Sequence, residues 1–231
     1  MPGTRGGPAA LLATVMAAVL IGAAAGTAHG QACGVATGRG AAAHGGYVQY
    51  DLGAGVSGAM IGLDVTSVSR PAVLPGQRFE SRLGYRTILL EPGPNPHIVR
   101  QVSAMEIPIT PLRFSLCPAL HAGGSWVTID DEPSFALAGG LGLRVAGTIL
   151  AGAGTAVPYA EVRGLAAYST GTVFDIEVEG TGLAVGVEAG LLAAFGRLTL
   201  QAAASLDGLD GGLGLTPYPR AAGELSAGVR F

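Results

Sequence analysis

The sequence predicts an all-β protein, a closed antiparallel transmembrane β-barrel of about 8–10 strands. Three observations favour this fold: apolar and polar residues alternate along most of the chain, charged residues make up only 13% of it, and an alternating segment ends on the last residue. Alternation with a period of two is the pattern of a strand with one apolar and one polar face. So few charges leave little polar surface with which to solvate a large exterior, and lipid forbids an open sheet edge.

Composition excludes several other classes of protein. Hydrophobic residues make up 49% of the 231 residues and glycine contributes 39, so the chain is too apolar for disorder and too glycine-rich for helices. No run of about 20 apolar residues follows the amino-terminal region, which argues against a helical membrane protein. A net charge of −3 without any basic cluster argues against nucleic acid as a partner.

The amino terminus has the features of a cleaved signal peptide over residues 1–30. Arg5 supplies a positive charge, Ala9–Ala25 is apolar, and Ala28-His29-Gly30 resembles a small-x-small cleavage site before Gln31. A retained membrane anchor is the weaker alternative, because the apolar stretch is short and ends in small residues. We expect residues 31–45 to form an N-terminal periplasmic segment and residues 46–231 to form the barrel.

Two cysteines, Cys33 and Cys117, follow the signal peptide. An even pair in an oxidising compartment favours a disulfide over two free thiols. Such a bond would tie the N-terminal segment to the inner wall near the periplasmic end. Cleavage before Cys33, followed by lipid attachment, is a further alternative, but Gly30-Gln31-Ala32 lacks the aliphatic residue of that motif.

The first two strands are expected near residues 47–53 and 61–65. In the first, Val48, Tyr50 and Leu52 are predicted to face lipid, and in the second Leu63 and Val65 are. The alternation changes phase just before the second strand, so we expect a turn there rather than one long strand, because a slip of one residue would exchange the two faces.

The remaining strands alternate clearly, with one exception. The residues expected to face lipid are Phe79, Leu83, Tyr85, Leu89, Phe114, Leu116, Leu120, Phe135, Leu137, Leu141, Leu143, Val145, Val162, Ala166, Tyr168, Leu183, Val185, Val187, Leu191, Leu198, Leu200 and Leu206. The exception is residues 98–109, where the pattern is mixed around Arg100, Gln101 and Glu106, so we expect a β-bulge.

Long and short connections alternate after residue 79. The expected long loops are 91–97, 125–133, 170–180 and 207–219, and the expected short turns are 110–112 and 195–197. Long loops of transmembrane barrels lie outside and short turns face the periplasm, so both termini are expected to be periplasmic. Eight strands remain an alternative if residues 47–68 form only an edge hairpin or an N-terminal extension.

A soluble β-sandwich also alternates, but the long unbroken apolar faces favour a lipid-facing band. The terminal segment places Leu225, Ala227, Val229 and Phe231 on one face. In these features the chain resembles the small outer-membrane β-barrel families and is similar to the transmembrane domain of outer membrane protein A. The resemblance implies a monomer in the cell outer membrane, surrounded by lipid, whose terminal residues are the signal for the barrel-assembly machinery. An aromatic content of 6% implies sparse girdles at the membrane interfaces.

Charged residues on the polar faces are expected to point into the lumen. They are Glu80, Arg82, Arg86, Arg113, Arg144, Glu161, Arg163, Glu188, Glu224 and Arg230. The interior of a small barrel is barely wider than its side chains, and a lone buried charge is costly, so opposite charges should pair and fill it. We expect a salt-bridged plug, with a narrow gated pore as the alternative.

The function indicated is that of a non-enzymatic outer-membrane barrel with an envelope-structural or narrow-pore role. An alternative is a surface binding or adhesion module acting through acidic loops, whose residues are Asp130, Asp131, Glu132, Asp175, Glu177, Glu179, Asp207 and Asp210. Such carboxylates suit divalent cations, but simple solvation is the stronger expectation, and we predict no metal site and no cofactor.

A rim-active lipid hydrolase is the weakest alternative. It would need a histidine with a serine or carboxylate partner. His121 is expected in the lumen and could meet Ser125, while His97 is expected in an outer loop and His44 before the first strand. No Gly-x-Ser-x-Gly, His-Glu-x-x-His or Cys-x-x-Cys motif occurs, so we predict that the protein is not an enzyme.

Overall fold

The computed structural model describes residues 33, 39–50, 56–69, 77–90, 94–109, 114–129, 132–151, 154–173, 176–210 and 217–231. The predicted signal peptide and Arg113 lie outside these residues. The described residues form an all-β structure, and none of their segments is a helix long and apolar enough to cross a membrane. The strands are β1 (Gly40–Tyr50), β2 (Val56–Ser69), β3 (Arg78–Leu90), β4 (His97–Ile109), β5 (Phe114–Ile129), β6 (Glu132–Gly147), β7 (Ile149–Ala151), β8 (Gly154–Val173), β9 (Ile176–Phe195), β10 (Leu198–Asp210) and β11 (Ala221–Arg230).

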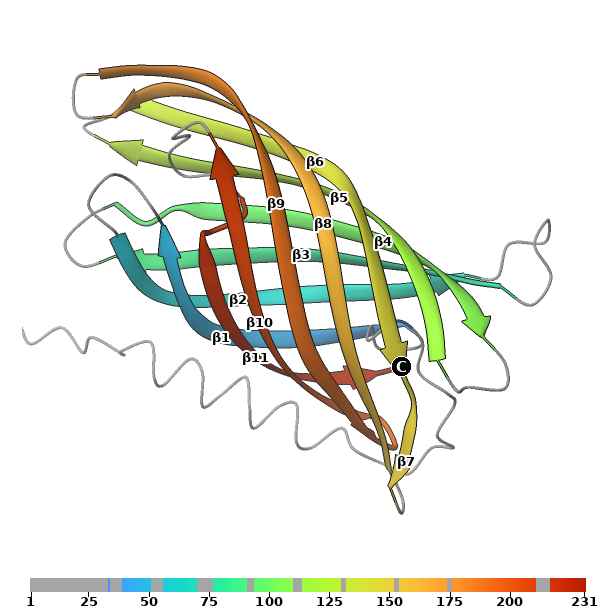
Figure 1. Ribbon diagram of the computed structural model, residues 1–231. Coiled ribbons are helices and arrows are strands. Elements are labelled where there is room, and N and C mark those ends of the chain that lie inside the picture. The colour runs from blue at the N-terminus through green and yellow to red at the C-terminus, as the bar shows by residue number, and fades with distance from the viewer. Residues whose placement is uncertain are drawn as a thin grey trace, which may run out of the picture.

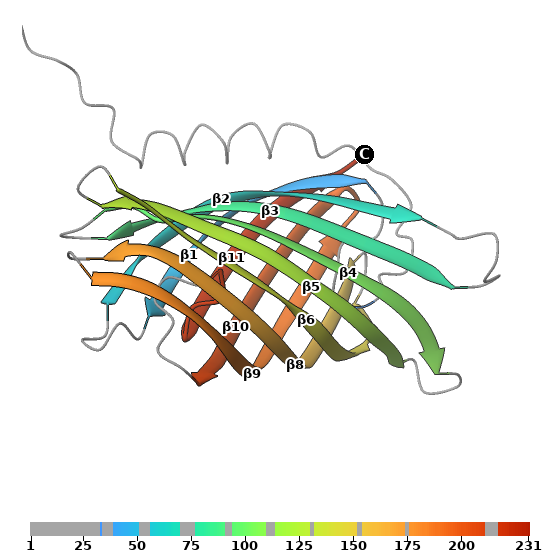
Figure 2. The ribbon, with the colours of Figure 1, turned by 90° about the horizontal axis from the view of Figure 1, so that it is seen from above.

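The strands form one closed antiparallel barrel (Figures 1 and 2). Each strand pairs with its neighbour in the chain, and β1 pairs with β11 from Gly40↔Arg230 to Gln49↔Ala221. Both β6 and the short β7 pair with β8 and are separated only by Thr148, so they form one interrupted strand. The barrel therefore has ten strands, and the first hairpin is part of its wall rather than an extension.

The two ends of the barrel can be named from its connections. At the terminal end, β1 begins and β11 ends; at the loop end, the chain passes from β1 to β2 and from β10 to β11. The tight turn at the terminal end between Phe195 and Leu198 is confirmed, and Gly196 takes the left-handed conformation there, with φ of 57°.

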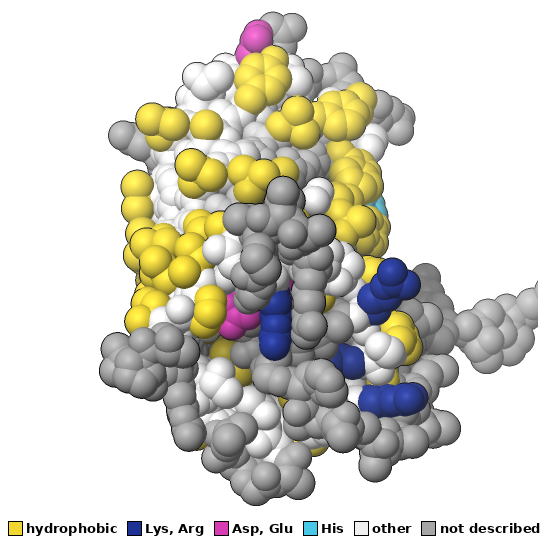
Figure 3. Space-filling model, turned by 90° about the vertical axis from the view of Figure 1, so that its right-hand side faces the viewer, with side chains coloured by type: hydrophobic (Ala, Val, Ile, Leu, Met, Phe, Trp, Pro, Cys, Tyr) yellow, Lys and Arg dark blue, Asp and Glu magenta, His cyan; other side chains and the backbone are white. Residues whose placement is uncertain are grey.

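The outer wall is apolar, as the alternation predicted. The most exposed large side chains include Leu63, Val65, Leu137, Leu141, Val162, Leu183, Val185, Leu206 and Leu225. Figure 3, which looks onto the terminal end, shows hydrophobic side chains along the flanks of the wall. Because the described strands turn their apolar rows outward and most of their charges inward, the exterior suits hydrocarbon rather than water.

Aromatic side chains form two girdles on this wall. At the loop end the girdle is Tyr47, Tyr85, Trp126, Phe135 and Tyr168; at the terminal end it is Phe79, Phe114, Phe195 and Phe231. The other described aromatic residues, Tyr50, Tyr159 and Tyr218, are buried. Few aromatic residues were expected to give sparse girdles, but nine of the twelve described ones are placed where membrane barrels carry such rings.

The first strand differs from the prediction in where it starts and in which of its two faces points into the lumen. It begins at Gly40, and its exposed aromatic is Tyr47, while Val48 and Tyr50 are buried at 0% and 2% exposure. Val48 and Tyr50 pack with Met60, Ile88 and neighbouring apolar residues inside the loop end of the lumen. The prediction failed because it took every apolar face to be a lipid face, whereas this end of the lumen is itself an apolar core.

Two predicted loops are largely strand, and the first residues of a third belong to β10. Residues 125–133 form the end of the β5–β6 hairpin, with Trp126 opposite Phe135, and residues 170–180 form the end of the β8–β9 hairpin, with Thr170 opposite Glu179. Strand β10 continues to Asp210. Polar and acidic residues did not stop these strands, because each long strand still finds a partner to complete its ladder. Asp130, Asp131 and Asp175 lie outside the described residues.

The predicted bulge in residues 98–109 is absent. The register that joins Ala104 to Ala119 continues as Ile107 to Leu116 with no added residue. The pattern looked mixed because Gln101 and Ser103 point outward on this strand, while Arg100 points inward.

Candidate functional site in the barrel lumen

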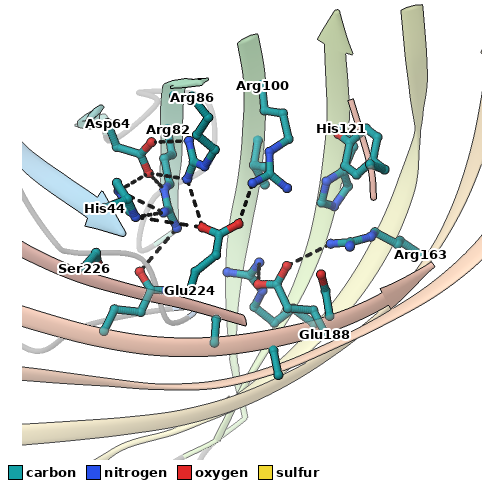
Figure 4. A pocket seen from close by; sticks show the side chains of 18 residues that line it. His44, Asp64, Arg82, Arg86, Arg100, His121, Arg163, Glu188, Glu224 and Ser226 are labelled. Atoms are coloured by element: carbon teal, nitrogen blue, oxygen red, sulfur yellow. Dashed lines mark hydrogen bonds and ion pairs between the residues drawn. The ribbon is translucent and has the colours of Figure 1, made fainter. Parts of the chain in front are cut away.

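Ten charged side chains meet in the middle of the lumen, and we call them the charge belt. Figure 4 labels part of the belt, namely Asp64, Arg82, Arg86, Arg100, Arg163, Glu188 and Glu224. Five are arginines and five are carboxylates, so their formal charges cancel. They are Arg82 and Arg86 on β3, Arg100 on β4, Arg144 on β6, Arg163 and Glu161 on β8, Asp64 on β2, Glu188 on β9, Asp207 on β10 and Glu224 on β11. The period of two places each of them on an inward position of its strand.

Asp64 is the centre of one half of the belt. Its oxygens accept hydrogen bonds from Arg86 Nη1 at 2.7 Å and Nη2 at 3.3 Å, and also from Arg82 Nε. His44 Nε2 lies 2.9 Å from the same carboxylate. The Asp64 side chain is 1% exposed, so these three partners supply the interactions that water would otherwise give.

Glu224 closes this half from the last strand. It accepts hydrogen bonds from Arg86 Nη2 at 3.2 Å and from Arg100 Nη2 at 2.6 Å. Because β11 pairs with β1, closure of the sheet is what brings Glu224 to arginines on β3 and β4.

Glu161 is the centre of the other half. Arg144 donates to it from Nε at 2.7 Å, and His121 Nε2 lies 2.6 Å from its other oxygen. The Arg144 guanidinium also lies over the Tyr159 ring, 4.6 Å from its centroid. All of these side chains are buried.

Arg163 holds two acids at once. Its Nε and Nη2 donate to Asp207 at 2.9 and 2.6 Å, and its Nη1 donates to Glu188 at 2.8 Å. The bidentate pair with Asp207 is the strongest geometry available to an arginine and a carboxylate. Asp207 was predicted in an outer loop, and this is corrected: it lies in β10, at 2% exposure, and points into the lumen.

Two uncharged residues join the halves. Gln201 accepts from Arg82 Nη1 at 3.3 Å and donates to Tyr159 Oη at 2.7 Å. Tyr218, from the segment before β11, lies between the guanidinium groups of Arg100 and Arg163, whose centres are 5.8 and 5.3 Å from its ring centroid. Burial raises the pKa of the Tyr218 phenol, so this ring is neutral at ordinary pH.

The belt leaves little open space. The cavity that His44, Arg82, Arg163, Tyr218 and neighbouring residues line has a volume of about 50 Å³. A space of this size accommodates a few water molecules but no larger solute. Apolar clusters around Met60 and around Leu165 cover the belt on the loop side.

On the terminal side the lumen contains the predicted disulfide. Cys33 and Cys117 are bonded, with Cα atoms 5.8 Å apart, and both are fully buried. Arg144 Nη1 donates to the carbonyl oxygen of Cys33 at 2.9 Å. Cys33, which precedes the first strand, is thus tied both to β5 and to the charge belt, near the terminal end as expected.

The structure places the lumen candidates that it describes on inward positions of their strands. Glu80 and Arg230 are inside but not in the belt: Arg230 donates to the Gly196 carbonyl oxygen, and Glu80, at 1% exposure, has no hydrogen bond within the described residues. Among those residues no cluster of three or more potential metal ligands occurs.

The sequence analysis missed four members of the site. They are His44, Asp64, Arg100 and Asp207. His44 was placed before the first strand, and this is corrected, since it lies in β1 and points into the lumen at 3% exposure. Extending the alternation of β10 forward to Asp210 would have found Asp207, whereas His44 shares a face with Val48 and Tyr50, whose direction was predicted wrongly.

Glycines on the inner face make room for the belt. A methyl group on Gly186 would overlap the Asp207 carboxylate, and one on Gly84 would overlap both Asp64 and Arg86. The long polar side chains therefore lie flat against the backbone of neighbouring strands. This requirement accounts for part of the high glycine content.

We expect Gly186→Ala to lower the free energy of unfolding by about 1–3 kcal/mol, because the added methyl displaces Asp207 from Arg163. Gly164→Ala is the matched control, since its methyl would point outward with no atom within 4 Å. The control should be neutral or slightly stabilising. Urea titrations, read from the gel shift between folded and unfolded forms, would measure both. Equal midpoints for the two variants would show that the belt tolerates the methyl.

The fold and site define a class: a closed, ten-stranded antiparallel β-barrel with an apolar outer wall and paired charges inside. No family model and no curated protein matches the chain. Among solved structures it is similar to the β domain of the Bordetella autotransporter Brka, at 15% identity and a TM-score of 0.48, covering 84% of this chain and 99% of that one. It is also similar to the translocator domain of the autotransporter NalP from Neisseria meningitidis, at 15% identity and a TM-score of 0.41, covering 96% of each chain.

Likenesses this distant carry no argument about function, and the barrel class rests on the strand register itself. The sequence predicted a similarity to outer membrane protein A. What is supported is the broader class of outer-membrane-type barrels, and not that family in particular.

Proposed function

We propose that this protein is a non-enzymatic barrel of the cell outer membrane whose lumen is closed, and that its role is envelope-structural. The observation that carries the proposal is the charge belt, in which five arginines and five carboxylates pair and leave a cavity of only about 50 Å³. The membrane location is supported by the apolar wall and its two girdles.

A structural role fits this lumen better than a diffusion path does. An ion crossing the barrel would have to separate pairs such as Arg163–Asp207, whose partners are 2% exposed each. Separating a buried pair leaves charges without compensation and is costly. The narrow-pore alternative therefore requires a rearranged lumen.

Planar-bilayer recording tests the closed lumen. We expect the folded protein to give no discrete conductance steps, both under oxidising conditions and after reduction of the Cys33–Cys117 bond. The reduced sample is the informative comparison, because it separates closure by the belt from closure by the tethered segment. Stable steps from the oxidised protein would establish a pore and end the structural proposal, while steps only after reduction would assign the closure to the tether.

Two alternative functions receive less support. The acidic surface for adhesion is smaller than predicted, since Asp207 lies in the lumen. The hydrolase alternative needed His121 at the outer rim, but His121 is 2% exposed and bonded to Glu161 in the middle of the belt. A histidine held there cannot reach a lipid ester at the membrane surface. The assembly-signal role of Leu225, Ala227, Val229 and Phe231 stays a prediction.

A further inference from the structure

One patch of the outer wall departs from its apolar character. Between the two girdles, the described outward positions carry apolar side chains or glycine except on adjoining parts of β2, β3 and β4. The exceptions are Ser67, Ser81, Ser103 and Gln101, which we call the polar patch.

The register makes the patch continuous. Ser67 is opposite Ser81, and Ser81 is opposite Ser103, so the three serines form one row across the strands. Gln101 is the next outward residue along β4, opposite Leu83. Phe79 and Tyr85 lie on either side of Ser81 along β3, one in each girdle, so the patch lies between the girdles, with its serine row next to Phe79 and Gln101 farther from it.

The patch satisfies only part of its own hydrogen-bonding capacity. Ser103 Oγ donates to Ser81 Oγ at 3.3 Å, and Gln101 Nε2 is 3.5 Å from Ser103 Oγ. Within the described residues, the side-chain oxygen Oε1 of Gln101 and the Ser67 hydroxyl have no hydrogen bond. Hydrocarbon offers neither donors nor acceptors, so an exposed carboxamide at this depth is costly.

We propose that a second copy of this chain covers the polar patch, so that the protein is a two-fold symmetric dimer in the membrane. The proposal rests on the proposed membrane location, because only hydrocarbon around the wall makes the patch unfavourable. It departs from the monomer expected from the sequence, where Gln101 was one of the residues around which the alternation was mixed.

The chemistry of the patch fits a copy of itself. Hydroxyl and carboxamide groups both donate and accept, so the same patch, turned by a two-fold rotation, offers what each side lacks. The patch carries no charge, and two copies would meet without repulsion. Its rim is apolar, with Val65, Leu83 and Leu120 each more than half exposed at 62%, 52% and 57%. In membranes, polar side chains of neighbouring transmembrane segments form hydrogen bonds with one another across interfaces that are otherwise apolar.

Cysteine cross-linking of the full chain in outer-membrane preparations tests the dimer. Both cysteines of the described structure are in a disulfide, so an introduced cysteine is the reactive one. We expect Ser81→Cys, near the centre of the patch, to give a disulfide-linked band at twice the monomer mass after mild oxidation. Ala202→Cys, exposed on β10 away from the patch, is the matched control and should stay monomeric.

A second variant measures the contribution of the carboxamide. In detergent, we expect Gln101→Leu to raise the dissociation constant of the dimer about tenfold. The leucine side chain needs no hydrogen-bond partner, so it is stable against hydrocarbon in the monomer. Sedimentation equilibrium would report the dissociation constant, and the variant should remain folded, since Gln101 is on the outside.

The outcomes are distinct. Folded, membrane-located Ser81→Cys protein that cross-links no more than Ala202→Cys would overturn the dimer and leave the proposed function intact. A cross-linked band of another mass would assign the patch to a different partner and also overturn it. Protein recovered as a soluble periplasmic species would overturn both proposals.

Discussion

Replacing Arg163 by methionine should lower the free energy of unfolding by about 3–5 kcal/mol, because it leaves the buried carboxylate of Asp207 without its cation and leaves Glu188 with only the more distant Arg144. Asp207 would lose both of the hydrogen bonds described, at 2.9 and 2.6 Å, and Glu188 would lose the one at 2.8 Å. Denaturant titration in lipid vesicles, followed by the gel shift of the folded form, would measure the change.

The double variant Arg163→Met with Asp207→Leu is the control for this result. Removing both partners of the pair should recover part of the stability, because a pair replaced by apolar groups of similar size is often tolerated where a lone charge is not. If Arg163→Met were as stable as the parent protein, the belt would be a solvated, loosely paired lumen and not the packed plug described above.

Removing the disulfide by Cys33→Ser with Cys117→Ser should destabilise the barrel by up to about 4.5 kcal/mol, since the bond closes a long loop of the unfolded chain. The two cysteines are 84 residues apart, and the bond ties Cys33, which precedes β1, to β5. The loss arises mainly in the unfolded state, so the folded double variant should keep its membrane location. Reduction of the parent protein should reproduce the effect.

Unchanged unfolding midpoints in both the double variant and the reduced protein would contradict this expectation. They would show that the N-terminal segment is held by its other contacts, such as the hydrogen bond from Arg144 to the Cys33 carbonyl oxygen.

The two proposals concern opposite faces of the same wall. Inside, the charges of the belt are acceptable because each has a partner of opposite sign; outside, the polar patch on β2–β4 lacks enough partners in a single barrel. The same rule, that polar groups away from water need partners, supports a closed lumen and a paired exterior. Conductance and cross-linking test these two faces independently.

Several features of the fold could be predicted because they depend on local pattern. The inward positions of Arg82, Arg144 and Glu161 follow from a period of two, which any strand imposes on its side chains. The faces of β1 could not be read in this way. Val48 and Tyr50 are apolar in a lumen that is apolar at one end, so hydrophobicity alone did not distinguish lipid from interior.

By itself, the sequence determined the alternation of apolar and polar faces and the apolar terminal row ending at Phe231, and from these it predicted a closed barrel with charges inside; it favoured a disulfide between Cys33 and Cys117 over free thiols. Only the tertiary structure decided which charges meet. Arg86 and Glu224 are 138 residues apart, and Arg82 and Gln201 are 119 apart. Such pairs depend on where the sheet closes and on the register of every strand between, and no local pattern contains that information. The register of β2 with β3 and of β3 with β4 likewise brought Gln101 and three serines together in one patch.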